Sequence, residues 1–270
     1  DINNPLRFHE TILGKPNIDS TTTFHRYNWT FNNITAAKLK SEKETNIDYS
    51  IKPVLENFQM DGIAGSLKNW QTFGIWLSKL NEGMDALSEN VKQEVIQVIG
   101  EEKDKKEIVK KLYRHLQENM RYVSIQLGIG GYKPMSAQAV HEYKYGDCKA
   151  LSNYMKAILN VAGITSKYII INAGKKAISP DPLDTRNIFN HAILAVPFEK
   201  DTMFLECTSN EAYPGYQGTF TGNRLALLVD GEHSGLVKTT QYDHTNNEIN
   251  NRFDIFIQTE APAEIIHHQI

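Results

Sequence analysis

One segment of the sequence, YGDCKALSNYMKAILNVAGI at residues 145–164, constrains the fold more than any other. Its apolar residues recur three and four positions apart, which predicts an amphipathic helix with one buried face. Gly146 and Asp147 supply turn chemistry before this helix, and Gly163 stands where a left-handed C-cap would end it. Cys148 is therefore predicted in the first turn of a helix that packs on the core. The apolar stripe consists of Leu151, Tyr154, Met155, Ile158, Leu159 and Ala162.

The position of Cys148 allows two interpretations. Unpaired backbone N–H groups and the positive end of the helix dipole favour the thiolate, which is the nucleophilic form of the side chain. A buried cysteine is more often an inert, small hydrophobic residue. Cys207 is the second of the two cysteines, and a disulfide between them would consume the nucleophile. Two cysteines are too few for a disulfide scaffold or for the common structural zinc patterns.

The composition is that of an ordinary globular protein. A chain of 270 residues can form one large domain or two small ones, and 40% hydrophobic with 23% charged residues is typical of either. The net charge of −3 and the lack of a long basic run argue against a nucleic-acid partner. The sequence has no transmembrane run. Because it begins at Asp1 within β-type sequence, we expect it to be an excised or processed portion of something longer.

The two ends of the chain have the alternating pattern of β-strands. Strands are predicted near the N-terminus over residues 6–12, 21–31 and 45–55. Three strands alone make a poor domain, so residues 1–57 are interpreted as the C-terminal part of an all-β domain. Strand alternation returns after a polar, Asn-rich stretch, and residues 246–270 are interpreted as the start of another β domain. Residues 58–245 are then the central core.

The sequence of the central core predicts helices first and then mainly strands. Helices are predicted over residues 66–80, with Ser66 or Asn69 as N-cap, and over 86–99 and 104–119. A strand over 121–128, a Gly-rich loop over 128–134 and a short helix or turn over 136–147 lead to the cysteine helix. The loop lacks the Gly-Lys-Ser/Thr ending of a phosphate-binding loop. Strands follow over 166–174, 189–198 and 202–209, with a second hairpin over 225–239.

A cysteine nucleophile needs a base, and His191 is the best candidate among the nine histidines. It alone lies inside a strongly apolar strand, where a polar side chain needs a reason. The alternative is a buried histidine whose hydrogen bonds are satisfied by its surroundings.

The hairpin that contains His191 supplies a partner for it. A symmetric turn at residues 199–200 pairs residues whose numbers sum to 399, which places His191 opposite Thr208. Glu206 is then a diagonal neighbour on the same face, and its carboxylate is predicted to bind Nδ1 of the imidazole and orient the ring. Cys207 points to the opposite face and is predicted to be structural. One extra residue in the turn would exchange the two faces.

Two other acids remain weaker candidates for the group that orients the histidine. Asp201 lies at the turn of the same hairpin, and Asp147 lies next to the cysteine. Asp147 more plausibly shapes the turn before the cysteine helix.

Three segments, YGDCKALSNYMKAILNVAGI, FNHAILAVPF and MFLECTS, resemble the bacterial transglutaminase-like proteins of the papain-like superfamily, especially those of Bacteroidota. The resemblance implies an α+β core of helices packed on an antiparallel sheet, flanked by partial β-sandwich segments. The string FHRYNWTFNNITA resembles the end of the β domain that precedes this core. The resemblance also implies a triad of Cys148, His191 and Glu206, although the acid of the family is commonly aspartate.

An oxyanion hole would use the Cys148 backbone N–H and one side-chain donor. Papain-like enzymes place a glutamine before the cysteine, so the resemblance implies Gln126. Related transglutaminases use an aromatic residue instead, for which Tyr132 or Tyr122 is available. A solvent-facing glutamine at a strand end is the structural alternative.

Two functions are then open. The first is cysteine-dependent acyl transfer on a peptide or protein substrate, with hydrolysis favoured because water is the default nucleophile in an open site. No cofactor or metal is expected, since His267 and His268 would point to opposite faces of a strand and no other compact cluster of ligands is present. The resemblance implies a periplasmic or cell-surface location.

The second function is a catalytically inactive module that keeps the fold. It would bind peptide or glycan in a groove lined by Tyr213, Tyr216 and Phe220, which lie in a long, aromatic, Gly-rich segment.

Overall fold

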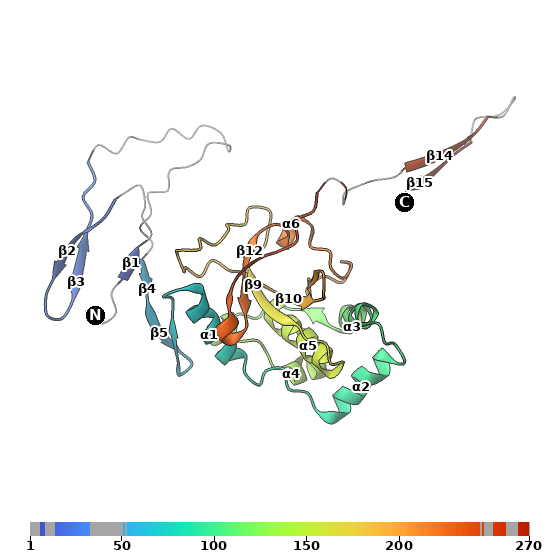
Figure 1. The fold of residues 1–270 in the computed structure, drawn as a ribbon, viewed down its shortest axis with the longest axis horizontal. Helices are drawn as coiled ribbons and strands as arrows, with labels where there is room; N and C mark the ends of the chain where they lie inside the picture. The colour runs from blue at the N-terminus through green and yellow to red at the C-terminus, as the bar shows by residue number, and fades with distance from the viewer. Residues whose placement is uncertain are drawn as a thin grey trace.

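A five-stranded antiparallel sheet with strand order β11-β10-β9-β12-β13 forms the centre of the computed structural model (Figure 1). The structure describes residues 6–8, 14–32, 51, 53–243, 245, 251–257 and 264–269. The strands of the sheet are β9 (Lys167–Ile171), β10 (His191–Pro197), β11 (Thr202–Leu205), β12 (Leu225–Val229) and β13 (Gly235–Lys238). The predicted strands over 166–174, 189–198, 202–209 and 225–239 are therefore confirmed in their central parts.

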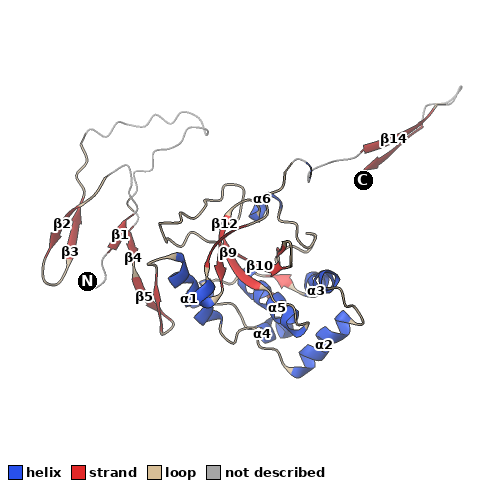
Figure 2. Cartoon of the chain, viewed as in Figure 1, coloured by secondary structure: helices blue, strands red, loops and turns tan. Residues whose placement is uncertain are grey.

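Helices cover one face of this sheet. They are α1 (Trp70–Asn81), α2 (Glu89–Ile99), α3 (Lys105–Asn119), α4 (Ala137–Tyr143) and α5 (Cys148–Val161), and the short α6 (Gly218–Thr221) lies apart from them, between β11 and β12 in the chain. Helices α1 and α5 pack on the face formed by alternate residues such as Ile170, Ala192 and Leu227, whereas α2, α3 and α4 pack around α5. Figure 2 shows helices around the central sheet and strands without helices in the two flanking parts. This is the predicted α+β fold.

The helix starts follow local capping chemistry. Asn69 caps α1 by accepting a hydrogen bond of 2.8 Å from the Thr72 backbone N–H, and the Thr72 hydroxyl bonds back to the Asn69 N–H. This capping box starts the helix at Trp70. Of the two predicted N-caps, Asn69 is confirmed and Ser66 is wrong, because Ser66 ends a strand.

The predicted strand over 121–128 is mostly wrong. Only β7 (Arg121–Tyr122) is strand, and it pairs in parallel with β8 (Tyr145–Gly146) just before the cysteine helix. Residues 128–131 form a 3₁₀ turn, η1 (Gly128–Gly131), in which Gly128 has a positive φ of 56°. A glycine accepts this backbone conformation without a steric cost, and it diverts the chain from an extended path.

Short two-stranded units make up the flanking segments. They are β1 (Leu6–Phe8) with β4 (Pro53–Leu55), β2 (Asn17–Ser20) with β3 (His25–Asn28), β5 (Asn57–Met60) with β6 (Ile63–Ser66), and β14 (Asn251–Phe256) with β15 (Glu264–Gln269). Residues 9–12, 45–50 and 52 of the predicted strands lie outside the described residues. The division into three domains stays a prediction.

The β5–β6 hairpin is built directly onto α1. The Trp76 indole N–H donates to the Ile63 carbonyl at 3.3 Å, and the Phe58 ring meets the Trp76 ring edge to face at 4.8 Å. A Cβ at Gly65 would lie 2.5 Å from Phe58 and 2.8 Å from Trp76, so a glycine is needed there. Within the described residues, no helix has both the length and the apolar character needed to cross a membrane.

Candidate active site

Cys148 is the first residue of α5 and is buried, with 3% of its surface exposed. Asp147 is the N-cap of the helix, and its carboxylate accepts a hydrogen bond of 3.0 Å from the Ala150 N–H. The thiol therefore lies at the positive end of the α5 dipole. Gly146 was predicted to supply turn chemistry, but it lies in β8. It is needed for close packing, because a Cβ there would lie 2.7 Å from the Ala150 Cβ.

The second oxygen of Asp147 is bound by a lysine next to the thiol. Lys149 Nζ pairs with Oδ2 of Asp147, and the two side chains are only 8% and 5% exposed. Asp147 therefore caps α5 with one oxygen and neutralises Lys149 with the other. Both of its oxygens are engaged in this way, so Asp147 is not the acid that orients the histidine. No sequence pattern singled out Lys149.

His191 is the first residue of β10, and its side chain is 8% exposed. Its Nε2 lies 2.9 Å from Oε1 and 3.0 Å from Oε2 of Glu206. The prediction that Glu206 binds Nδ1 is therefore wrong, because the ring presents its outer nitrogen to the carboxylate. Nδ1 is then the ring nitrogen that can exchange a proton with the thiol of Cys148.

The hairpin register explains why His191 and Glu206 meet. Leu194 pairs with Leu205 and Val196 with Met203, so the partners sum to 399 as predicted. Strand β11 ends at Leu205, and Glu206 follows it directly. His191 and Glu206 therefore keep the predicted diagonal relation across the hairpin, although both lie just beyond its paired residues.

Two further side chains hold Glu206. The Thr208 hydroxyl donates to Oε1 of the carboxylate at 2.6 Å, and the Tyr113 hydroxyl donates to the Glu206 backbone carbonyl at 2.6 Å. Burial raises the pKa of Tyr113 well above its usual value, so this hydroxyl stays a donor. Thr208 was predicted opposite His191 and could have been found from that register. Tyr113 could not, because it reaches Glu206 from α3, which is 93 positions away in the chain.

The pKa of His191 is raised to about 9. Burial of the ring lowers the pKa, but hydrogen bonds to Cys148 and Glu206, together with the charges of these two groups, outweigh it. At neutral pH the ring is therefore an imidazolium that lies between the Cys148 thiol and the Glu206 carboxyl group. A protonated imidazole next to a cysteine is an arrangement that can activate the thiol as a nucleophile.

Cys148 and His191 line one small cavity of about 80 Å³. Gln126 also lines it, from an exposed loop position, and Tyr132 lines it with its ring edge to face on Trp76 at 5.3 Å. Two of the three predicted oxyanion donors, Gln126 and Tyr132, thus line the same cavity as the thiol. Tyr122 is 43% exposed on β7 and is not among the residues that line this cavity.

Two other predicted residues lie away from the thiol. Asp201 pairs with Lys106 at 3.1 Å on the exposed end of the hairpin. Cys207 is buried in the helix-covered face of the sheet, where burial raises the pKa of its thiol well above its usual value. Both cysteines are free thiols. The structural interpretation of Cys207 agrees with this placement.

The long aromatic segment reaches the site at one residue. The Phe220 ring meets the His191 ring edge to face, with centroids 5.3 Å apart. Tyr216 packs instead on Tyr242 at 5.8 Å, and Tyr213 is 82% exposed. Phe220 therefore covers one side of the imidazole, whereas the other two aromatic rings form exposed surface.

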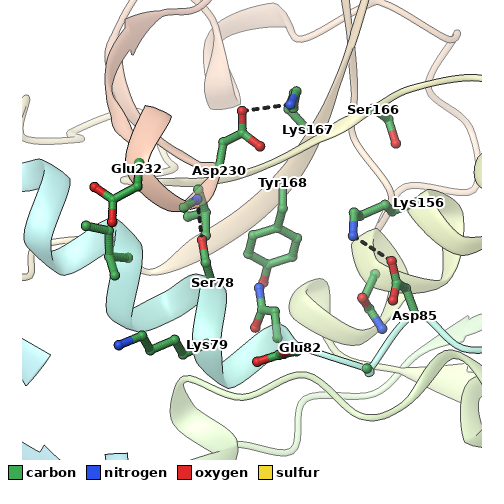
Figure 3. Close-up of a pocket in the computed structure, with 16 residues that line it drawn as sticks. Ser78, Lys79, Glu82, Asp85, Lys156, Ser166, Lys167, Tyr168, Asp230 and Glu232 are labelled. Atoms are coloured by element: carbon green, nitrogen blue, oxygen red, sulfur yellow. Dashed lines mark hydrogen bonds and ion pairs between the residues drawn. The ribbon is translucent and has the colours of Figure 1, made fainter. Parts of the chain in front are cut away.

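A second, larger cavity lies elsewhere on α1 (Figure 3). Its volume is about 550 Å³, and four of the charged side chains that line it form two ion pairs. Lys156 binds Asp85 at 2.6 Å and Lys167 binds Asp230 at 2.7 Å. Neither the thiol nor the imidazole lines this cavity, so we assign the chemistry to the smaller one.

A known family model matches the central part of the chain. Residues 92–205 match the family model of the transglutaminase-like superfamily, a range that includes Cys148 and His191 and ends one residue before Glu206. None of the curated protein sequences compared is significantly similar to the chain.

Two solved structures are similar to the chain. A "putative protease" from Parabacteroides distasonis superposes with a TM-score of 0.58 at 17% identity, over 89% of this chain and 43% of that one. A "putative cysteine protease" from Cytophaga hutchinsonii gives a TM-score of 0.37 at 13% identity, over 71% of this chain and 54% of that one. The chain thus spans about half of each protein's length, and the first likeness supports the fold alone. Residues 92–205, which hold Cys148 and His191, therefore form a transglutaminase-like domain within this chain.

Proposed function

We propose that this domain is a cysteine enzyme that transfers acyl groups from peptide or amide substrates, and that water is its usual acceptor. The observation that carries the proposal is the buried pair of His191 and Glu206 in one cavity with a thiol at a helix N-terminus. A buried, carboxylate-bound imidazolium next to a cysteine thiol has few structural uses, and it has a direct catalytic one.

The proposed reaction has two stages. The Cys148 thiolate attacks the substrate carbonyl carbon and forms a C–S bond, and the oxyanion accepts hydrogen bonds from the Cys148 N–H and from Gln126 or Tyr132. His191 gives its Nδ1 proton to the leaving amine as the C–N bond breaks. Water then attacks the carbonyl carbon of the thioester and passes a proton to His191. The C–S bond breaks, which releases the carboxylic acid and restores the thiolate. Glu206 keeps the ring oriented and stabilises its positive charge.

The thiol cavity is large enough for water to act as the acceptor. About 80 Å³ leaves room for water molecules next to the thiol, since each occupies roughly 30 Å³ in the liquid. A primary amine would have to enter the same space to produce a crosslink. Transamidation is therefore the second outcome that the experiment has to distinguish.

An assay with two acceptors tests the proposal. A peptide amide is incubated with the protein, with and without a fluorescent primary amine, and the free acid and the amine adduct are quantified. We expect the free acid to dominate, and both products to disappear in Cys148→Ala and His191→Ala. Equal product from wild type and Cys148→Ala would contradict the proposal.

A non-catalytic module remains the competing function. The exposed rings of Tyr213 and Tyr216 next to Phe220 offer a surface for peptide or glycan. A protein that binds such ligands without turnover, and whose Cys148 is alkylated no faster than a free thiol, would favour the module.

A further inference from the structure

An open apolar groove lies next to the thiol cavity. Its volume is about 620 Å³, in the range of sites that bind organic ligands, and it lies between α1 and the strands β4 and β5. Half-buried apolar side chains such as Val54, Phe58, Met60 and Leu67 line it. Figure 1 shows β4 and β5 on the α1 side of the core. Apolar side chains that stay partly exposed around a groove favour the binding of an apolar ligand.

The walls of this groove are fixed in place. The β5–β6 hairpin is held on α1 by the Phe58–Trp76 contact and by the Trp76 hydrogen bond to Ile63. The β1–β4 pair is held by Arg7, whose guanidinium donates to the backbone carbonyls of Leu67 and Lys68. Arg7 also lies 3.6 Å from Glu56. A preformed apolar surface binds without the entropic cost of ordering its own side chains.

The groove is continuous with the thiol cavity. Tyr132 and Asn187 line both of them, so a chain that lies across the thiol enters the groove directly. The thiol cavity, at about 80 Å³, has room for the reacting amide and little more. The binding energy that positions a peptide must therefore come largely from neighbouring surface.

We propose that this groove binds apolar side chains of the peptide substrate on one side of the scissile bond. The proposal rests on the proposed function and names its substrate class, which is a peptide with large apolar residues at that position. It also makes the β1–β4 pair and the β5–β6 hairpin part of the substrate-binding surface. An apolar pocket discriminates by roughly 10- to 100-fold between an apolar and a small polar residue.

The experiment compares two peptides that differ only in having leucine or serine at each tested position. Wild type should cleave the leucine peptide with a kcat/KM roughly 10- to 100-fold higher at one position. The Val54→Asp variant should lose most of this preference through KM, with kcat changed less than about threefold. Met60→Ser should show the same change more weakly. Ile96→Asp is the matched control, since Ile96 is an exposed apolar residue on α2, and it should behave as wild type.

Two further readouts separate folding and chemistry from binding. The rate at which iodoacetamide alkylates Cys148 should be the same in wild type and Val54→Asp, because this reagent is too small to use the groove. Binding of both peptides to the Cys148→Ser variant is measured by fluorescence anisotropy and needs no turnover.

The outcomes are distinguishable. If no peptide is cleaved, the proposed hydrolysis fails, but tighter binding of the leucine peptide to Cys148→Ser that Val54→Asp weakens still supports the groove. If wild type shows no apolar preference, or keeps it in both Val54→Asp and Met60→Ser, the groove proposal is overturned even though the enzyme is active.

Discussion

Replacing Glu206 by glutamine tests how the histidine is activated. The amide is nearly isosteric with the carboxylate, so its oxygen can still accept from Nε2 of His191, which lies 2.9 Å from Oε1. The substitution removes the negative charge and leaves most of the packing in place. It therefore isolates the electrostatic role of the acid.

The magnitude follows from the pKa of His191. Raising this pKa from 6.5 to about 9 corresponds to roughly 3 kcal/mol in favour of the imidazolium. The hydrogen bond and charge of Glu206 supply part of this raise, and Cys148 supplies the rest. Glu206→Gln should therefore bring the pKa of His191 down towards its ordinary value. We expect kcat/KM to fall by about 10²- to 10³-fold, because the acid of a triad both orients and charges the imidazole.

The assay is the pH dependence of kcat/KM and of the rate at which iodoacetamide alkylates Cys148. In wild type the alkaline limb should lie near pH 9, where His191 loses its proton. In Glu206→Gln this limb should move to lower pH. Glu211→Gln is the matched control, since Glu211 is exposed on the same segment. An unchanged limb and unchanged activity in Glu206→Gln would refute the assigned role.

Three further predictions concern stability. Because the pKa of His191 is about 9 in the folded state, protonation of this ring stabilises the fold fully below pH 6.5, and the stabilisation is lost as the pH rises to about 9. The free energy of unfolding, measured with urea, should therefore fall over that interval by roughly 3 kcal/mol more in wild type than in His191→Gln. Parallel pH curves for the two proteins would contradict this. Asp147→Asn leaves the buried Lys149 without its counter-charge and should cost about 3–5 kcal/mol, whereas Asp147→Asn with Lys149→Met should cost clearly less; equal losses would show that the ion pair is not responsible. Gly146→Ala introduces a Cβ 2.7 Å from a side chain of α5 and should cost about 1–3 kcal/mol, against little change for Gly235→Ala, where no atom lies within 4 Å.

Local patterns predicted the parts of the site that depend on neighbours in sequence. The apolar stripe after Cys148 predicted α5 because helix periodicity is a short-range property. The number of residues in the turn at 199–200 predicted the register that brings Glu206 to His191, because each strand alternates its faces with a period of two.

The remaining features depend on contacts between distant segments. Which nitrogen of His191 faces Glu206 is set by the ring's rotamer, which the register does not determine. Tyr113 reaches the Glu206 carbonyl from α3, 93 positions away in the chain. The groove beside Tyr132 forms because Gly65 lets the β5–β6 hairpin lie directly on α1. No periodic pattern carries such information.

The most direct test of the proposed function compares the two cysteines of the chain, with Cys207 as the control for Cys148. Both cysteines are buried free thiols, but Cys148 lies next to His191 at a helix N-terminus, whereas Cys207 lies in the core, where burial raises its pKa. A peptide with an electrophilic carbonyl is incubated with the folded protein, and the modified residue is mapped by mass spectrometry. The proposed function predicts a covalent adduct on Cys148 alone, formed much more slowly in His191→Ala. An adduct on Cys207, or labelling of Cys148 at the same rate in wild type and His191→Ala, would contradict it.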